Sequence, residues 1–291
     1  MSPTFKGVLA AAGGILFLTL NDAVSKYLTQ SFPVGQVICL RQAATLLFIV
    51  PYVALVTGFG ALRVVSWRGQ LTRGMLFVGG SAFMVWGLAT LPLATVITIM
   101  FVSPAFIAAL SAPMLAERVG LHRWIAIASG FVGVMIVMRP GGASFEWALL
   151  IPVAGAFTNA FRDIMTRRLA RTETSVAILF WSAVIVTVAN ATTAPVWVPV
   201  PVSAAAWFIF VGLLNTGAHF LLIEAFRMAE AALVAPVRYT GLVWAVVLGY
   251  AVWGELPDAW VLLGAAVIVA SGVYMIRMES RPRTALEQPA A

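Results

Sequence analysis

Residues 94–115, ATVITIMFVSPAFIAALSAPML, carry no charged side chain over a length that suits a membrane-crossing helix. A helix rises about 1.5 Å per residue, so about 20 apolar residues cross the roughly 30 Å of hydrocarbon in a bilayer. Apolar blocks of this length recur along the chain, and the alternating segments of about ten residues that are typical of a membrane β-barrel do not. The sequence therefore predicts an all-α polytopic membrane protein.

The composition argues against a soluble protein and against nucleic-acid binding. Hydrophobic residues make up 62% of the 291 residues and charged residues only 10%, whereas a soluble domain is about one quarter charged. The formal net charge of +7 is scattered over short loops, without the basic helix or stacking surface that nucleic acids require. We therefore expect membrane lipid, and no nucleic acid, as a partner.

Ten transmembrane helices are predicted, separated by short connections that contain charges, proline or glycine. The predicted spans are residues 7–28, 34–57, 73–91, 94–115, 121–138, 146–168, 175–193, 205–226, 230–253 and 258–277. Residues 278–291 are polar and contain proline, which predicts a disordered cytoplasmic tail.

The basic residues of the loops predict the orientation in the membrane. They concentrate on the side of the N-terminus, and only Lys26 and Arg139 fall on the other side. Cytoplasmic loops are enriched in Lys and Arg. Both termini are therefore expected in the cytoplasm.

An internal repeat divides the chain into residues 1–142 and 143–277. At a shift of about 140 residues, Asp22 aligns with Asp163, Phe101 with Tyr239, and Glu117 with Glu255 in the same order. Each half holds an odd number of spans, five, so the two five-helix repeats are inverted in the membrane. Inverted repeats are characteristic of secondary transporters; a duplication that only built a stable bundle is the alternative.

The ten spans, the duplication and the glutamates that close the fourth and ninth spans, Glu117 and Glu255, resemble the EamA-type drug/metabolite transporter superfamily. The resemblance covers nearly all of residues 7–277 and looks closest to bacterial amino-acid exporters, particularly those for aromatic amino acids. It implies a multi-pass protein of the bacterial inner (plasma) membrane. It also implies alternating access, with a site between the halves that is lined by spans 1, 3, 4, 6, 8 and 9.

The expected function is therefore export of amino acids, aromatic ones included, or of related small metabolites. A carrier of drugs, cations or other metabolites is the first alternative, and a membrane enzyme or receptor without transport is the second. The chain has no Gly-rich phosphate loop, which argues against an ATP-hydrolysing domain. Its two histidines stand at different membrane levels, which argues against a metal site. We expect no catalytic residues and no cofactor.

Charged side chains within the spans are candidates for gating or structural ion pairs. Each costs at least about 2.5 kcal/mol at the membrane midplane, so such residues usually face the bundle interior. We expect Asp22 and Arg41 to pair or share a polar cavity near the external side. Asp163 and Arg238 are their expected mirror on the cytoplasmic side, with Arg162 as a competitor for Asp163.

Polar and aromatic residues within the spans are candidates for the substrate cavity. Arg238 suits an amino-acid carboxylate because a guanidinium binds carboxylates with two parallel hydrogen bonds. Asn215 and His219 are four residues apart and share one helix face, although a lone histidine is more often structural. For each aromatic residue, lipid-facing packing is the alternative. The expected cavity residues are Asn21, Trp86, Phe101, Asn159, Asn215, His219, Arg238, Tyr239 and Trp244.

Overall fold

The computed structural model describes residues 3–115, 121–140, 146–229 and 237–279. Within these residues every regular element is a helix, which confirms the predicted all-α class. The predicted tail at 278–291 lies almost entirely outside the described residues, and so does Glu117.

The helices of the first half follow the predicted spans to within a few residues at most ends. A π-turn, Val53–Thr57, and a 3-10 turn, Phe59–Leu62, extend the second span. The helices are α1 (Pro3–Thr29), α2 (Val34–Tyr52), α3 (Trp67–Thr90), α4 (Leu93–Met100), α5 (Ser103–Leu115) and α6 (Leu121–Met138).

The second half repeats this order. Two 3-10 turns, Trp147–Leu149 and Ala194–Val196, flank its first two helices. The helices are α7 (Leu150–Leu169), α8 (Ser175–Ala191), α9 (Val202–Met228), α11 (Thr240–Trp253) and α12 (Ala259–Glu279).

Within the described residues, five helical segments are by themselves long and apolar enough to cross a membrane. Four further apolar helices are shorter, and α7 carries several charges along its length. The predicted number of ten spans and the cytoplasmic termini therefore stay predictions. The five segments are Phe5–Thr29, Val34–Thr57, Trp67–Thr90, Leu93–Leu110 and Val202–Ala225.

The fourth span is not the single helix expected over 94–115. It breaks at Phe101 and Val102, just before Pro104, because proline lacks the backbone N–H that would continue the helix and its ring clashes with the preceding turn. In the second half, Tyr239 occupies the turn that precedes α11. Phe101 and Tyr239 are repeat partners, and their rings meet edge to face with centroids 5.3 Å apart. Both halves therefore break at the same repeat position, where they touch.

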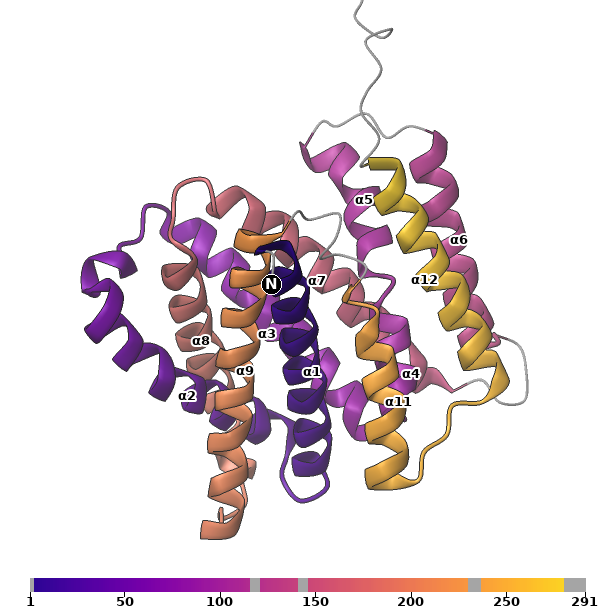
Figure 1. The fold of residues 1–291 in the computed structure, drawn as a ribbon. Coiled ribbons are helices and arrows are strands. Elements are labelled where there is room, and N and C mark those ends of the chain that lie inside the picture. Colours follow the sequence, from indigo (N-terminus) through magenta and orange to yellow (C-terminus); the bar gives the residue numbers. More distant parts are fainter. Residues whose placement is uncertain (1–2, 116–120, 141–145, 230–236, 280–291) are drawn as a thin grey trace, which may run out of the picture.

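The packing of the helices has the internal symmetry of a duplicated chain. In Figure 1, α1, α2, α3, α8 and α9 form one group and α4, α5, α6, α11 and α12 form another, with α7 crossing between them. The repeat partners are α1 and α7, α2 and α8, α3 and α9, α5 and α11, and α6 and α12. When each helix is replaced by its partner, the contact of α1 with α9 becomes that of α7 with α3, α2 with α9 becomes α8 with α3, and α5 with α7 becomes α11 with α1. The contacts of α2 with α8 and of α6 with α12 are unchanged by the exchange. The first helices of the two halves, α1 and α7, run in opposite directions in Figure 1.

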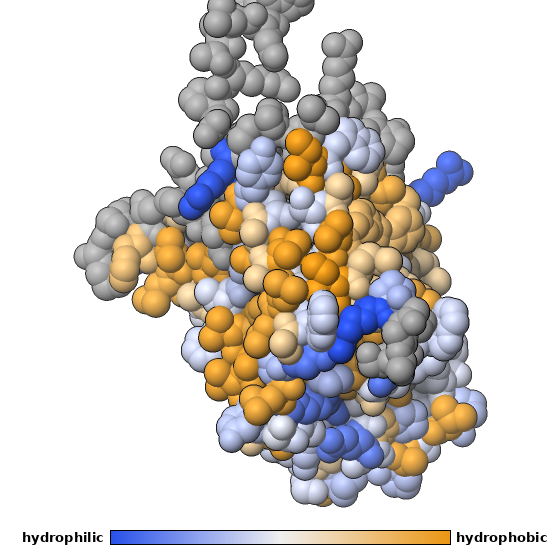
Figure 2. All heavy atoms as spheres, turned by 90° about the vertical axis from the view of Figure 1, so that its right-hand side faces the viewer, coloured by the Kyte–Doolittle hydropathy of each residue, from blue (hydrophilic) through white to orange (hydrophobic). Residues whose placement is uncertain are grey.

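Close approach of α6 and α12 depends on two glycines. A Cβ atom on Gly133 would lie 2.9 Å from the carbonyl oxygen of Gly264, and one on Gly264 would lie 2.6 Å from that of Gly133. Small residues of this kind let membrane helices pack backbone to backbone. Figure 2 shows hydrophobic side chains spread over the side of the molecule where α6 and α12 lie. Val132 and Met135 of α6 and Leu263 of α12 are exposed. This exterior suits contact with lipid.

Candidate functional site

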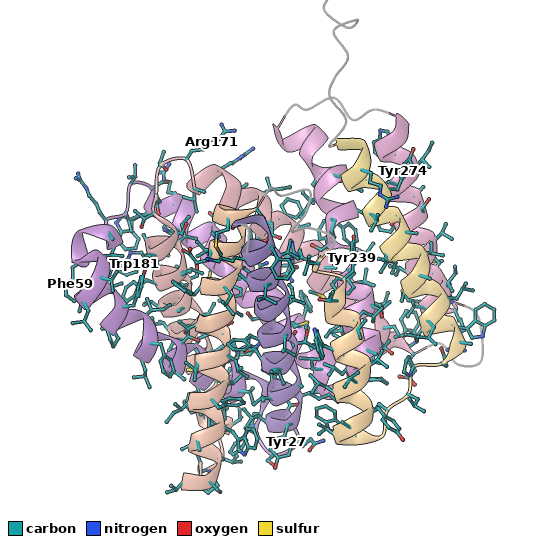
Figure 3. All side chains as sticks on the ribbon, viewed as in Figure 1. Tyr27, Phe59, Arg171, Trp181, Tyr239 and Tyr274 are labelled. Atoms are coloured by element: carbon teal, nitrogen blue, oxygen red, sulfur yellow. The ribbon has the colours of Figure 1, made fainter. Side chains whose placement is uncertain are left out.

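A pocket of about 460 Å³ lies between α2, α3, α8 and α9. Its volume falls within the range of roughly 300–1,000 Å³ that is typical of small-molecule sites. The lining extends from Gln42, at mid-depth, to Ser175 and Glu224, at the end where α8 begins and α9 ends. Arg171, in the turn before α8, lies in Figure 3 at the opposite end of the molecule from Tyr27. The pocket therefore opens at the Arg171 end.

One face of α2 supplies a wall of the pocket. Gln42, Thr45, Phe48, Ile49 and Tyr52 recur every three or four residues, which places them on the same side of the helix. Gln42 and Thr45 are buried, and Tyr52, at the end of the helix, is exposed. The wall thus changes from hydrogen-bonding groups in the interior to aromatic groups near the opening.

The deep end of the pocket is a cluster of neutral hydrogen-bonding side chains. The Asn215 amide nitrogen donates to the Thr45 hydroxyl at 3.2 Å and to the Gln42 amide oxygen at 3.5 Å. His219 Nδ1 lies 2.8 Å from the Asn215 carbonyl oxygen. A carbonyl oxygen only accepts, so Nδ1 carries a proton and Nε2 is the remaining polar atom of the ring.

Aromatic side chains form much of the remaining wall. Phe48, Phe77 and Phe220 line the pocket, and the Phe220 ring meets that of Tyr52 edge to face with centroids 6.5 Å apart. The Arg162 guanidinium lies 5.2 Å from the centre of the Phe77 ring. The pocket can therefore hold a flat apolar group between aromatic faces, with donors and acceptors at its deep end.

The expected cavity residues do not all meet in this pocket. Asn215 and His219 line it, from the shared face of α9 that their spacing predicts. The other seven are not part of its lining: Asn21, Trp86, Phe101, Asn159, Arg238, Tyr239 and Trp244.

Several of those seven lie at packing contacts or on the exterior. The Asn159 amide oxygen sits against Gly80 of α3, where an added Cβ would collide with it. The Tyr239 ring packs on Gly272 of α12, and Tyr239 also borders a separate apolar groove between α11 and α12. Trp86 is 52% exposed. Trp244 is half-buried in α11.

Asp22 and Arg41 interact through their charges without forming an ion pair within 4 Å. The Arg41 Nη1 atom donates to the Ser25 hydroxyl at 3.1 Å, and Asp22 accepts from the Asn21 amide nitrogen at 3.2 Å. Asn21, Asp22 and Ser25 of α1 and Arg41 of α2 thus form one polar group between the two helices. Asp22 and Arg41 therefore share a polar environment without a direct ion pair.

Of the two partners that the sequence offered for Asp163, the structure brings Arg162 and not Arg238 to it. Asp163 is paired with its neighbour Arg162 at 2.9 Å, the competitor that the sequence already offered. Arg238 is exposed, in the turn that precedes α11. The break of the ninth span at this turn explains the difference, because depth counted along a continuous helix no longer applies beyond a break.

Sequence reasoning missed Gln42 and Thr45. They are three residues apart in the second span, and polar residues at helical spacing within a span are a usable signal for a cavity. The prediction used the charged Arg41 of the same span instead and left its neutral neighbours out.

Comparison with known proteins agrees with this architecture. The EamA-like transporter family matches the chain twice, over residues 5–139 and again over residues 146–278. A riboflavin transporter of Rhizobium johnstonii is 34% identical over 273 residues, which is 92% of this chain and 89% of the relative. An S-adenosylmethionine uptake transporter of Rickettsia bellii is 29% identical and covers 90% of each chain.

Two more distant matches also extend over nearly the whole chain. A pseudopaline exporter of Pseudomonas aeruginosa is 24% identical and covers 93% of this chain and 96% of the relative. One solved crystal structure, 19% identical, superposes with a TM-score of 0.66 over 94% of this chain and 99% of that one. None of these three relatives is named as an amino-acid exporter, so that part of the resemblance has no support here. The chain belongs to the EamA-like transporter family and is a multi-pass membrane transporter of the bacterial inner membrane.

Proposed function

We propose that this transporter carries a neutral heteroaromatic metabolite of the riboflavin type by alternating access between its two halves. The observation that carries the proposal is the cluster of Gln42, Thr45 and Asn215 at the deep end of a pocket with aromatic walls. A flavin ring system presents carbonyl and N–H groups along one edge of a flat, largely apolar surface.

The chemistry of the two surfaces is complementary. Carboxamide side chains both donate and accept hydrogen bonds, so Gln42 and Asn215 can meet either kind of group on a heterocycle. Aromatic side chains favour stacked or edge-on contact with a flat ring. A neutral substrate also avoids the penalty of moving a charge from water into a partly apolar site. The riboflavin transporter with 34% identity over most of both chains supports the same substrate class.

Amino-acid export, expected from the sequence, fits the pocket less well. An amino acid carries a carboxylate, and Arg238, its expected ligand, is exposed and outside the pocket lining. The deep end of the pocket holds neutral groups instead. Amino acids therefore serve as competing substrates in the test.

S-adenosylmethionine is a second candidate, favoured by one feature of the pocket. Glu224 contributes a carboxylate to the lining near the opening, where it could attract a sulfonium or ammonium group. The relative from Rickettsia bellii is named for uptake of that compound.

Counterflow in proteoliposomes tests the proposal directly. Purified full-length protein is reconstituted into vesicles loaded with unlabelled riboflavin, and entry of labelled riboflavin is measured. We expect saturable entry that other isoalloxazines inhibit and that tryptophan and phenylalanine do not. Entry of labelled S-adenosylmethionine without riboflavin exchange would replace the first candidate by the second. Exchange of aromatic amino acids alone, or of none of these compounds, would contradict both.

We further propose that the chain has ten membrane spans and that both termini lie in the cytoplasm. The first five-helix repeat would comprise residues 1–142 and the second residues 143–277. The excess of basic loop residues on one side supports this orientation. A fluorescent protein that folds only in the cytoplasm, fused after Ala291, should fluoresce. A periplasmic reporter active at the same position would overturn the orientation.

A further inference from the structure

An ion pair whose side chains are 9% and 24% exposed joins the two halves at the end of the bundle opposite the pocket opening. Lys26, near the end of α1, places Nζ 2.5 Å from Glu255 Oε1, in the segment that follows α11. Lys26 is only 7% exposed. Tyr27, the next residue, marks this end of the molecule in Figure 3.

Both charged groups make additional hydrogen bonds to the same short connection between α3 and α4. Lys26 Nζ also donates to the Leu91 carbonyl oxygen at 2.8 Å, and Glu255 Oε2 accepts from the Leu93 backbone N–H at 3.0 Å. The Lys26 ammonium lies 5.1 Å from the centre of the Trp253 ring. Two segments of the first half, α1 and the connection between α3 and α4, and the end of α11 with the segment that follows it in the second half therefore converge on one pair of charges.

The local sequence after α11 builds this geometry. Gly254 has φ +69°, a left-handed conformation that glycine adopts without the penalty of a Cβ atom. The chain reverses there, and the Glu255 N–H donates back to the Gly249 carbonyl oxygen at 3.1 Å. The reversal directs Glu255 back toward the first half rather than onward along α11.

The region beside the ion pair is closed by tightly packed small residues. Ala23 of α1, Ala94 of α4 and Ala245 of α11 belong to one buried apolar cluster and are at most 6% exposed. At the opposite end, Ser175, Tyr52 and Phe220 line the pocket and are exposed. The structure is therefore open at one end and closed at the end that holds Lys26 and Glu255.

We propose that the Lys26–Glu255 pair is the gate that holds the predicted external end closed and that it must break before substrate can pass. A transporter that alternates its access has to separate its halves at this end, and of the two ion pairs that join them there, Lys26–Glu255 is the less exposed one. Breaking the ion pair leaves two separate charges, and separate charges are more stable in water than in the closed interior. Opening of this end is therefore coupled to its hydration. The gate goes beyond the proposed substrate, because it concerns the conformation of the carrier whatever its cargo.

Labelling of an engineered cysteine from outside the cell tests the gate. Ala94→Cys is placed in a Cys39→Ser background of the full chain, and a membrane-impermeant maleimide is added to intact cells. In the parent the A94C thiol should react slowly because Ala94 is buried. In the double variant Lys26→Met/Glu255→Leu, which leaves no unpaired charge, we expect labelling to accelerate by about tenfold or more as the open state gains population. Ala23→Cys repeats the measurement on a second helix.

A second ion pair at the same end provides the matched control. Arg139 and Asp258 also join the two halves, but their side chains are 31% and 46% exposed. Arg139→Gln should leave labelling of the A94C thiol unchanged, and Lys26→Arg should keep it slow. Unchanged labelling in the double variant at both cysteine positions, or an equal increase with Arg139→Gln, would overturn the gate. Because the assay needs no substrate, its failure would be distinct from failure of the riboflavin proposal.

Discussion

The two halves contain the same pair of helices in two different arrangements. In the first half α2 packs on α3, whereas their repeat partners α8 and α9 do not pack closely along their described lengths, and the pocket lies between them. The closed pair belongs to the half whose Lys26 is tied to Glu255. One structure thus shows the same pair of helices in contact in the first repeat and apart in the second. Exchange of the two arrangements would close the pocket and open the other end, as alternating access requires.

Filling the open pair should have the largest effect on transport. Ala183 is buried in α8 and lines the pocket, so Ala183→Trp would place an indole in the space that substrate needs. We expect the initial rate of substrate counterflow to fall by about tenfold or more, since the occupied pocket can no longer hold a ligand.

Val188 on the same helix is 64% exposed. The matched variant Val188→Trp should transport at the parent rate, measured at equal protein in the vesicles. Equal rates for the two variants would show that the gap between α8 and α9 is not the substrate path.

Two glycines that are repeat partners should differ in their tolerance of a methyl group. A Cβ on Gly212 of α9 would lie 2.7 Å and 2.9 Å from backbone atoms of Ala44 and Thr45 in α2. A Cβ on Gly74 of α3 would instead meet the Ile185 side chain of α8, with its outermost carbon at 2.5 Å. The outer carbons of Ile185 can rotate away, and only its Cβ, at 3.0 Å, is fixed, whereas both backbone contacts of Gly212 are fixed.

We therefore expect Gly212→Ala to lower the free energy of unfolding by about 1–3 kcal/mol, and Gly74→Ala to lower it less. Thermal unfolding of both variants in detergent measures the difference. A larger loss for Gly74→Ala would mean that the contact between α8 and α3 is the more rigid of the two.

Removing the deep polar group should weaken substrate binding without unfolding the protein. Asn215→Leu loses a side chain that can hydrogen-bond a heterocycle, and one neutral hydrogen bond contributes about 0.5–1.5 kcal/mol. We expect KM for riboflavin counterflow to rise by about five- to tenfold, the equivalent of roughly 1 kcal/mol. Asn190→Ala is the control, because Asn190 donates to the Val186 carbonyl oxygen within α8 at 2.9 Å and is not part of the pocket lining. An unchanged KM for Asn215→Leu would remove Asn215 from the site.

The smallest effect concerns the exposed ion pair at the closed end. Burial acts to raise the pKa of Asp258, but the hydrogen bond from the Val261 N–H and the Arg139 guanidinium outweigh it and hold that pKa below its usual value. Because the folded pKa is the lower one, the stabilisation is present above the ordinary pKa of the carboxyl and is lost as the pH falls through the folded value. The free energy of unfolding should therefore decrease slightly below about pH 4, and less so in high salt. Asp258→Asn should flatten this dependence; an unchanged profile would assign the acid sensitivity to other groups.

Part of the fold and little of the site could be predicted from the sequence. The all-α class and the duplication are confirmed, and the aligned pair Phe101 and Tyr239 meets at the contact between the halves. The fourth span was expected to be one helix, although Pro104 within it was the residue that broke it. Asn215 and His219 were placed on one face correctly because helix periodicity is local. Their neighbours Gln42 and Thr45 come from α2, and no local pattern says which distant face packs against α9.

The sequence by itself determined that this chain is a membrane protein with an internal duplication. The length of the apolar segments and the order of the repeated residues can be read from the chain without knowing any tertiary contact. Only the tertiary structure decided which polar side chains share a pocket and that Lys26 meets Glu255 across the halves. Those contacts depend on helix packing between segments far apart in the chain, and in a bundle with internal symmetry the same sequence repeat can be held open at one end and closed at the other.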